Sequence, residues 1–280
     1  MDRGDLHIHT DVSDGAFSPA QVARCVLQGG LGFVSVTDHN SLGALGTVEA
    51  ALRGSGVEFI SGVELSVQPQ RGGEIHILGY GCDPSAAALK DICQQLTDNK
   101  KEQLREIVRL LKQQGVVVDL AALDLEGQGY VGRPVLADLL VRKGFVSSVN
   151  QAFGRYLNQK APTFVPMRSL APKRCIGILH ECGGVAVLAH PTIEIVDRWI
   201  DSLAREGLDG VEVYRPALNG NEQLYIEKAA EHFSLFVTGG SDWHGRDSEP
   251  ALGTFAVQRE QVAGFFASLS PAGDGPAGRR

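Results

Sequence analysis

The sequence predicts an α/β fold in which a parallel β-sheet is covered by helices and interrupted by a helical insertion. Short apolar runs typical of buried strands alternate with amphipathic segments at helical spacing. Between about residues 84 and 166 this alternation stops and helical spacing dominates, after which the strand–helix order resumes. With 280 residues, 43% of them hydrophobic, the chain is long enough for one large α/β domain with an inserted lobe.

Seven segments are predicted as strands because each is short, apolar or alternating, and bounded by turn residues. They are residues 5–10, 33–36, 58–66, 74–80, 185–189, 208–214 and 235–240. The first predicted helix begins at Ser18-Pro19, with the serine as N-cap and the proline at the first helical position, and ends at Gly29. Further helices are predicted around residues 45–52 and 175–181.

The segment 84–166 is predicted to be a helical insertion that caps one end of the sheet. Its first half has apolar residues at helical spacing from Leu89 to Leu111 within a long charged helix, and shorter helical runs follow. Insertions on such scaffolds commonly carry substrate selection. The chain is thus divided into a discontinuous main domain of residues 1–83 and 167–269, the insertion, and a Gly- and Pro-rich tail, 270–280, that is predicted to be disordered.

The composition predicts a cytoplasmic protein that binds neither duplex DNA nor membranes. The net charge of −7 argues against the basic face that sequence-independent binding to duplex nucleic acid needs. No apolar stretch approaches the ~20 residues of a membrane-spanning helix, and no basic segment followed by an apolar run suggests a signal peptide. The five cysteines form no Cys-x-x-Cys pair, which is typical of reduced cysteines in the cytosol.

Most histidines lie at or just beyond predicted strands, and carboxylates lie at comparable positions. The histidines are His7, His9, His39, His76, His190 and His244, and the carboxylates are Asp5, Asp14, Asp38, Glu64 and Asp242. His7 and His9 are two residues apart, so on a strand both side chains leave the same face. In an α/β barrel the C-terminal ends of the strands meet on one face, where active sites form. These side chains are therefore expected to converge there.

Imidazoles and carboxylates without thiolates indicate a site for Zn²⁺, Mn²⁺ or Fe rather than a cysteine-based structural zinc. Each of these histidines alone could simply bond a neighbour, but the set together favours metal ligation. His180 and His232 fall on predicted helices and are interpreted as surface or packing residues. Asp5 and Asp38 are interpreted as residues that orient the ligand histidines, with capping of strand ends as the alternative.

These motifs resemble those of the PHP (polymerase and histidinol phosphatase) family. They are a His-x-His near the start, Thr-Asp-His-Asn, a strand glutamate, a lone histidine, Ala-His-Pro and Gly-Ser-Asp-x-His, over residues 1–80 and 183–258. The resemblance implies a distorted (β/α)7 TIM-like barrel with two or three divalent metal ions at the strand ends. Mn²⁺ is the first choice, with Zn²⁺ or Fe²⁺ as alternatives.

By motif position, the resemblance implies three ligand sets and a catalytic group within them. The first ion would be held by His7, His9, Glu64 and Asp242; the second by Glu64, His76 and His190; the third by Asp14, His39 and His244. Some histidinol-phosphatase-like members have histidine at the position of Asp14, and aspartate is also a competent ligand. The residues expected to act in catalysis are Asp242, Glu64 and His190.

The charge of such a centre favours a phosphoester substrate. Three divalent ions bring six positive charges and three ligand carboxylates remove three, which leaves roughly +3 in a protein of net charge −7. A pocket of this kind attracts phosphate and stabilises the charge that develops during its transfer. Water acidified by two ions could attack phosphorus while the third ion holds a phosphate or leaving-group oxygen.

Within the family, Gly132-Arg133-Pro134 and the layout of residues 84–166 resemble a bacterial subgroup that acts on nucleoside 3′,5′-bisphosphates and trims short RNA from its 5′ end. This implies a small nucleotide or oligoribonucleotide substrate, with Arg133 holding a second phosphate. Arg215 and Lys160 are further candidate anchors, and for each of the three a solvated surface charge is the alternative. Relatives often have histidine where this chain has Val135, so its specificity could differ.

Other functions stay open at this point. A histidinol-phosphate phosphatase would not need two anion sites. A non-catalytic metal-binding module, like the PHP domains attached to DNA polymerases, is disfavoured because every ligand position holds a ligand-type residue. A hydrolase of C–N bonds would not explain the basic anchors. Tyr130 and Trp243 are candidate walls for a stacked base, with packing as the alternative. The native metal and the oligomeric state are left open.

Overall fold

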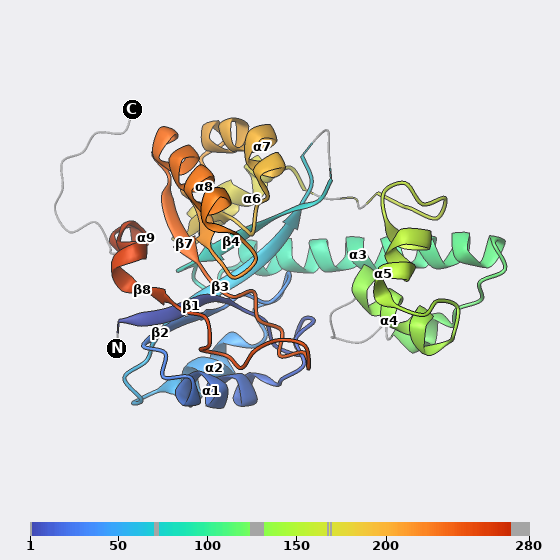
Figure 1. Ribbon diagram of the computed structural model, residues 1–280, viewed down its shortest axis with the longest axis horizontal. Coiled ribbons are helices and arrows are strands. Elements are labelled where there is room, and N and C mark those ends of the chain that lie inside the picture. Colours follow the sequence, from blue (N-terminus) through green and yellow to red (C-terminus); the bar gives the residue numbers. More distant parts are fainter. Residues whose placement is uncertain (1, 70–72, 124–131, 167, 169, 270–280) are drawn as a thin grey trace.

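A computed structural model of the chain describes residues 2–69, 73–123, 132–166, 168 and 170–269, and shows a β-barrel with a projecting helical subdomain (Figure 1). Among these residues, eight strands form one sheet in the order β7-β6-β5-β4-β3-β2-β1-β8. They are β1 (Arg3–Ile8), β2 (Phe33–Val36), β3 (Glu58–Val67), β4 (Ile75–Tyr80), β5 (Val185–Leu188), β6 (Gly210–Tyr214), β7 (Phe236–Gly239) and β8 (Val257–Gln258). The predicted α/β barrel fold is confirmed.

The barrel is nearly closed by contacts between β1 and the segment that follows β7. The Trp243 N–H donates to the His7 carbonyl at 3.3 Å, and the His9 N–H donates to the Trp243 carbonyl at 2.8 Å. Gly240 lies so close to β1 that a Cβ at this position would come within 2.4 Å of the His7 Cβ. Main-chain packing therefore joins the first strand to the last part of the barrel beside the predicted metal ligands.

β4 runs antiparallel to both β3 and β5, whereas the sequence analysis predicted a parallel sheet. The reason is the short connection between β3 and β4, residues 68–74, because a parallel connection needs a dozen or more residues. β8, which pairs antiparallel with β1, was not predicted because it spans only two residues. The remaining neighbouring strands are parallel, as expected.

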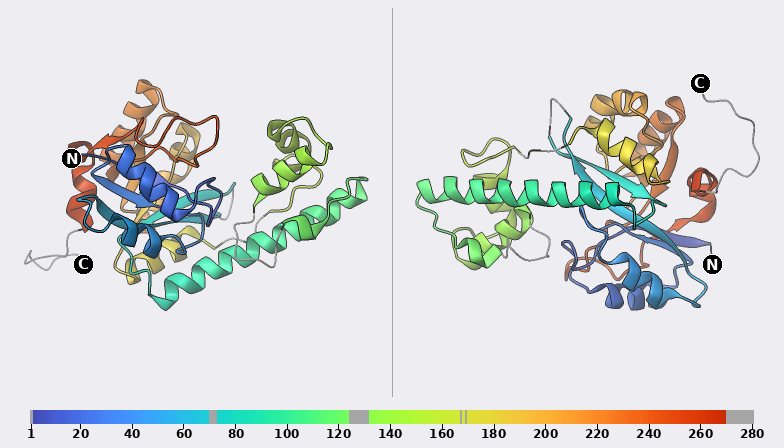
Figure 2. Two further views of the ribbon diagram at one scale, coloured as in Figure 1. Left: turned by 90° about the horizontal axis from the view of Figure 1, so that it is seen from below. Right: turned by 180° about the vertical axis from the view of Figure 1, so that it is seen from behind.

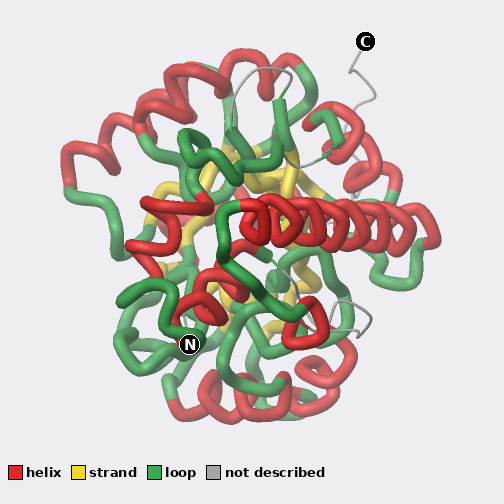
Figure 3. Tube along the Cα trace, turned by 90° about the vertical axis from the view of Figure 1, so that its right-hand side faces the viewer, coloured by secondary structure: helices red, strands yellow, loops and turns green. Residues whose placement is uncertain are grey.

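Helices surround the barrel, as Figure 3 shows from the side of the subdomain. They are α1 (Pro19–Gln28), α2 (Leu45–Leu52), α6 (Pro172–Glu181), α7 (Ile193–Arg205), α8 (Gly220–His232), the 3₁₀ turn η3 (Arg259–Val262) and α9 (Ala263–Leu269). At the start of α1 the Gln21 side chain accepts hydrogen bonds from the N–H and hydroxyl of Ser18, at 2.9 and 2.8 Å, so this helix begins where predicted. Among the described helices, none combines the length and the hydropathy needed to cross a lipid bilayer.

The segment predicted as an insertion is built on one long helix, α3 (Ala87–Gln113), which runs from the barrel to the far end of the subdomain (Figure 2). Its outer half carries η1 (Leu120–Leu123), α4 (Arg133–Arg142), α5 (Val149–Ala152) and the π-helical turn η2 (Phe153–Leu157). Leu89 and Ile92 pack in the barrel core, whereas Leu104 and Leu111 belong to a separate core with Leu140. This second core supports the proposed division at about residues 84 and 166. The tail predicted to be disordered, 270–280, lies outside the described residues.

Replacing Gly240 with alanine is expected to separate β1 from the end of β7. The new Cβ would overlap the Cβ and backbone nitrogen of His7, at 2.4 and 2.5 Å, so we expect the free energy of unfolding in urea to fall by about 1–3 kcal/mol. Gly177→Ala, on α6, is the matched control because a Cβ there meets nothing within 4 Å; it should be neutral or stabilising by up to about 1 kcal/mol. Unchanged stability of Gly240→Ala would contradict this packing.

Candidate metal centre

The structure brings all the predicted ligand residues together at one end of the barrel, although they come from six different strand ends. His7, Glu64 and His76 lie within β1, β3 and β4, and the others follow strands: His9 and Asp14 after β1, His39 after β2, His190 after β5, and Asp242 and His244 after β7. Within the described part of the chain, all of these residues except His190 fall into three overlapping groups, and in each group one nitrogen or oxygen atom per residue lies within 4.8 Å of the others.

The first group is His7, His9, Glu64 and Asp242, which is the predicted first ligand set. Glu64 Oε2 lies 3.4 Å from His7 Nε2 and 3.2 Å from His9 Nε2. Asp242 Oδ1 lies 3.3 and 3.1 Å from the same two nitrogens. Two imidazoles and two carboxylates therefore converge on one small volume.

The second group gathers around the other oxygen of Glu64. Glu64 Oε1 lies 2.7 Å from His76 Nδ1 and 2.9 Å from His190 Nε2, and these two nitrogens are 3.0 Å apart. These are the residues of the predicted second set. His39 falls in one group with Glu64 and His76, although its Nδ1 lies 3.0 Å from Glu64 Oε2, the oxygen that also faces His7 and His9. Glu64 thus presents Oε2 to His7 and His9 and Oε1 to His76 and His190, as a carboxylate that bridges two ions would.

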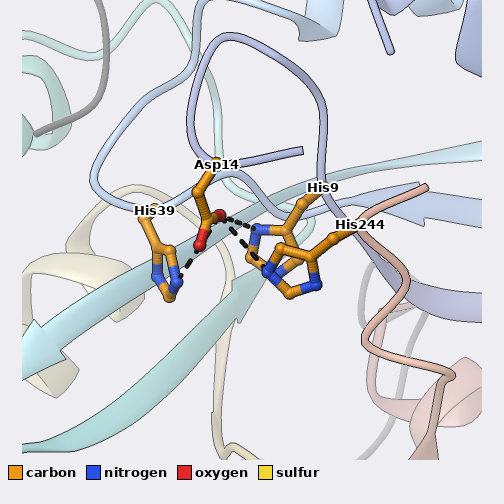
Figure 4. A group of neighbouring side chains, drawn as sticks. All are labelled: His9, Asp14, His39 and His244. Carbon is orange, nitrogen blue, oxygen red and sulfur yellow. Dashed lines mark ion pairs between the residues drawn. The ribbon is translucent and has the colours of Figure 1, made fainter. Parts of the chain in front are cut away.

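The third group surrounds Asp14, whose carboxylate lies between His39 on one side and His9 and His244 on the other (Figure 4). Asp14 Oδ1 is 3.3 Å from His244 Nε2, 3.6 Å from His9 Nδ1 and 3.9 Å from His39 Nε2. His9 was not predicted for this set. Both of its ring nitrogens face carboxylates, so His9 stands between the first and third groups.

The arrangement fits divalent cations. Two ligand atoms that each lie about 2.1 Å from one ion are at most about 4.2 Å apart, and most of the distances within each group fall below this limit. His9 Nε2 is buried and is aligned with neither nearby carboxylate oxygen for a hydrogen bond, which is unfavourable unless a cation binds there. Imidazole and carboxylate donors without thiolate suit Mn²⁺, Zn²⁺ or Fe²⁺.

Electrostatics keep Glu64 ionised. Burial works against its charge, but the neighbouring charges of His39, His76 and His7 hold its pKa well below the usual range of a glutamate. A carboxylate that is fully buried and ionised needs positive partners on both oxygens, because an uncompensated buried charge is costly. The two groups around Glu64 provide them.

Two of the ligand residues, and one residue beside them, have backbone angles that are uncommon without glycine. His190, Asp242 and Asn40 have φ of 30°, 55° and 49°. The left-handed conformation costs a non-glycine residue roughly 1–2 kcal/mol, and such strain gathers at functional sites. Hydrogen bonds hold it in place: the His190 N–H donates to Glu212 Oε2 at 2.7 Å, and the Asn40 N–H donates to the Glu64 carbonyl at 2.8 Å.

Asp5 and Asp38 hold loops rather than imidazole rings. Asp5 accepts hydrogen bonds from the N–H and hydroxyl of Ser241, at 2.9 and 2.5 Å, which ties the segment after β7 to β1. Asp38 accepts from the N–H and hydroxyl of Thr10, both at 2.7 Å. Burial raises the pKa of Asp5 to about 6. The structure therefore favours the alternative reading, in which these aspartates cap the strand ends that carry the ligands.

Glu212, a fully buried residue of β6, contacts two ligand residues and was not predicted. Glu212 Oε1 lies 3.0 Å from His7 Nδ1, and Oε2 accepts the His190 N–H. Metal-binding histidines usually donate their second ring N–H to a carboxylate, which fixes the ring with its other nitrogen toward the ion. The sequence did contain a signal for Glu212, because a glutamate in the middle of an apolar strand must have a polar or charged partner.

A cavity of about 230 Å³ joins the metal centre to the helical subdomain. Its lining includes Asp14, His39, Glu74 and His76 from the barrel and Lys100, Gln103, Arg133 and Phe153 from the subdomain. Arg133 therefore lies in the wall of the same cavity as metal-centre residues, and its contact with a second phosphate stays a prediction. A small substrate bound in this cavity could contact the metal-centre residues and the subdomain residues at the same time.

The other predicted substrate residues do not line this cavity. The Arg215 guanidinium donates to the Pro191 carbonyl, and its Nε is buried with no hydrogen-bond partner among the described residues. Lys160 is exposed, so its role stays a prediction. Trp243 is buried and donates its indole N–H to the Pro250 carbonyl at 3.0 Å, which is a packing role. Tyr130 lies outside the described residues.

Comparison with known proteins agrees with the motifs. Residues 5–136 match the model of the PHP domain. The match marks this part of the chain as a PHP domain. This PHP protein is 29% identical over 245 residues to a 5′-3′ exoribonuclease of Haemophilus influenzae, covering 86% of this chain and 89% of the relative. It is 29% identical over 255 residues to a 3′,5′-nucleoside bisphosphate phosphatase of Chromobacterium violaceum, with 87% and 89% covered.

A crystal structure from Bifidobacterium adolescentis, provisionally described as a metal-dependent phosphoesterase, superposes on this PHP protein with a TM-score of 0.83. The two sequences are 25% identical, and the match covers 96% of this chain and 97% of the other. The domain match, the shared fold and the clusters of histidines and carboxylates that could hold metal ions therefore agree with one another. The predicted family resemblance is confirmed.

Removing divalent metal from the PHP protein is expected to lower its stability. A ligand present at 100 times its Kd stabilises the folded state by about 2.7 kcal/mol, so Mn²⁺ added to chelator-treated protein should raise the Tm. Glu64→Gln should lose most of this gain because Glu64 faces two groups of ligands. His232→Gln, at an exposed helical histidine, should keep it. Equal Mn²⁺-induced shifts in wild type and Glu64→Gln would contradict the proposed bridge.

Proposed function

We propose that this PHP protein removes the 3′-phosphate of nucleoside 3′,5′-bisphosphates and trims short RNA from its 5′ end. The observation that carries the proposal is the single cavity lined by metal-centre residues on one side and by Arg133 on the other. A substrate with two phosphates could place one at the metal centre and the other against the guanidinium. The names of two relatives, a bisphosphate phosphatase and an exoribonuclease, support the same substrate class.

The ligand residues would hold two or three divalent ions, with Mn²⁺ the first choice and Zn²⁺ or Fe²⁺ the alternatives. Bound ions of this kind lower the pKa of water and neutralise charge on a phosphoryl group. Arg133 would bind the second phosphate through two parallel N–H donors, which is the geometry that favours arginine over lysine at such sites. The residue thereby fixes the orientation of the ester at the other end of the cavity.

We assign the catalytic contacts to Glu64, His190 and Asp242. Glu64 is fully buried between the first and second groups and sets the spacing between them. The side chains of His190 and Asp242 are 28% and 38% exposed, whereas those of His7, His9 and Glu64 are fully buried. His190 and Asp242 are therefore the ligands that a substrate or a transferred proton can reach from solvent.

The acidic net charge and the free cysteines support a cytoplasmic protein that acts on small nucleotides rather than on duplex DNA. Arg215 and Lys160 do not line the cavity, so Arg133 is the one of the three predicted anchors to which we assign the second phosphate. Val135 packs partly against the subdomain core, and we propose that its replacement of a histidine found in relatives modifies substrate preference.

The proposal is tested by phosphate release from adenosine 3′,5′-bisphosphate, AMP and histidinol phosphate with Mn²⁺-loaded protein. We expect a strong preference for the bisphosphate. At saturating Mn²⁺, Arg133→Ala should lower kcat/KM for the bisphosphate by about 10–100-fold, the effect of losing one charge-assisted contact worth about 1.5–3 kcal/mol, and should barely change AMP turnover. Arg142→Ala, an exposed position on the same helix α4, is the control.

Failure of all three substrates in protein that still binds Mn²⁺ would refute the phosphatase proposal. An equal loss of activity on the bisphosphate and on AMP in Arg133→Ala would leave the activity standing but would remove Arg133 as the contact for a second phosphate.

A further inference from the structure

Glu74, just before β4, is a carboxylate of the cavity that the proposed function does not use. Its side chain is only 15% exposed. Oε1 lies 3.2 Å from His76 Nε2 and 3.5 Å from Lys100 Nζ, and Oε2 lies 3.5 Å from Arg133 Nη2. One carboxylate of the barrel is thus surrounded by a ligand histidine and by two cations of the helical subdomain.

The two ring nitrogens of His76 face different partners, so the contact with Glu74 bears on which nitrogen carries the proton. Nδ1 faces Glu64 Oε1 at 2.7 Å and His190 Nε2 at 3.0 Å, on the metal side. Nε2 faces Glu74. A neutral imidazole carries one proton, and the partner of one nitrogen decides which nitrogen keeps a free lone pair. An Nε2–H that donates to Glu74 leaves Nδ1 free to bind a cation.

The carboxylate is itself held from the subdomain. Lys100 lies in the middle of α3 with its side chain 7% exposed, and Arg133 is the first residue of α4 and also donates to the Leu157 carbonyl at 3.4 Å. A buried glutamate stays charged only when cations compensate the lost hydration. Lys100 and Arg133 supply that compensation, so the subdomain supports a residue that contacts a metal ligand.

We propose that Glu74 is a positioning residue, which accepts a hydrogen bond from the Nε2–H of His76 and so fixes the ring with Nδ1 toward the metal centre, and that Lys100 and Arg133 hold the Glu74 side chain in place. The helical subdomain then has a second task besides contacting substrate, because it stabilises the second ligand group. The part of this proposal that concerns turnover rests on the proposed function, whereas the part that concerns metal affinity does not.

The test compares Glu74→Ala with Glu74→Gln in the full chain after chelator treatment. Mn²⁺ affinity is measured by titration, with the signal of free Mn²⁺ in electron paramagnetic resonance as the readout and no substrate present. Glu74→Ala should weaken the affinity of at least one Mn²⁺ by about 10–100-fold, the usual effect of losing a partner of a ligand histidine. Glu74→Gln should stay within about threefold of wild type, because the amide oxygen can still accept from Nε2–H.

Turnover of adenosine 3′,5′-bisphosphate gives a second readout. Glu74→Ala should lose kcat at low Mn²⁺ and regain it when Mn²⁺ is raised by the same 10–100-fold, which a defect in folding would not do. Glu102→Gln, an exposed carboxylate of α3, is the control and should match wild type in both assays.

Wild-type Mn²⁺ affinity in Glu74→Ala would overturn the proposal. An equally large loss in Glu74→Gln and Glu74→Ala would also overturn it, because the hydrogen bond to His76 would then not be the cause. If the predicted affinities are found but no variant, wild type included, hydrolyses the bisphosphate, the positioning role of Glu74 stands and the proposed function fails.

Discussion

The structure depends on one buried carboxylate. Glu64 sits at the centre of the strand ends, fully buried, with one oxygen facing His7 and His9 and the other facing His76 and His190. A charge in this position would cost several kcal/mol if it stood alone. The surrounding histidines and the cations they are suited to bind offset that cost. The shared carboxylate also places two ligand groups side by side, which is what phosphoester chemistry with paired metal ions requires.

Near this carboxylate the barrel closes, because the segment after β7 meets the first strand, β1. Gly240 allows the segment after β7 to lie against β1, and Asp5 ties the same segment down through Ser241. Glu212 then links the first and second groups, because one of its oxygens contacts His7 and the other accepts the His190 N–H. Much of the polar interior thus serves to hold ligands in place, and the strained backbone at His190 and Asp242 is confined to the same region.

Much of the fold and most of the ligand positions could be predicted from the sequence, for a physical reason. Strand ends of an α/β barrel meet on one face, so histidines and carboxylates that follow predicted strands must lie near one another. This reasoning placed His7, Glu64 and Asp242 together without any knowledge of distances. The first set that the family resemblance implied coincides with an observed group, whereas the observed second group has His39 in place of His190 and the third also contains His9.

The features that escaped prediction depend on contacts between residues far apart in the chain. Glu212 contacts His7 across the barrel, and Arg133 meets Glu74 only because α4 packs back along α3. No local pattern encodes such pairs. The direction of β4 was a different kind of error, since the short connection before it was visible and excludes a parallel crossover. Asp38 was interpreted as orienting a histidine, with capping of a strand end as the alternative; it bonds the backbone and hydroxyl of Thr10, a choice that spacing along the chain cannot reveal.

The central claim, that Glu64 is shared between two ions, is tested most directly by anomalous diffraction from crystals of the Mn²⁺-loaded protein at the manganese absorption edge. We predict separate manganese peaks on the two sides of Glu64, each at about 2.1 Å from a different carboxylate oxygen, with one next to His7 and His9 and the other next to His76 and His190. A single peak in this region, or peaks that none of the Glu64 oxygens contact, would contradict the account.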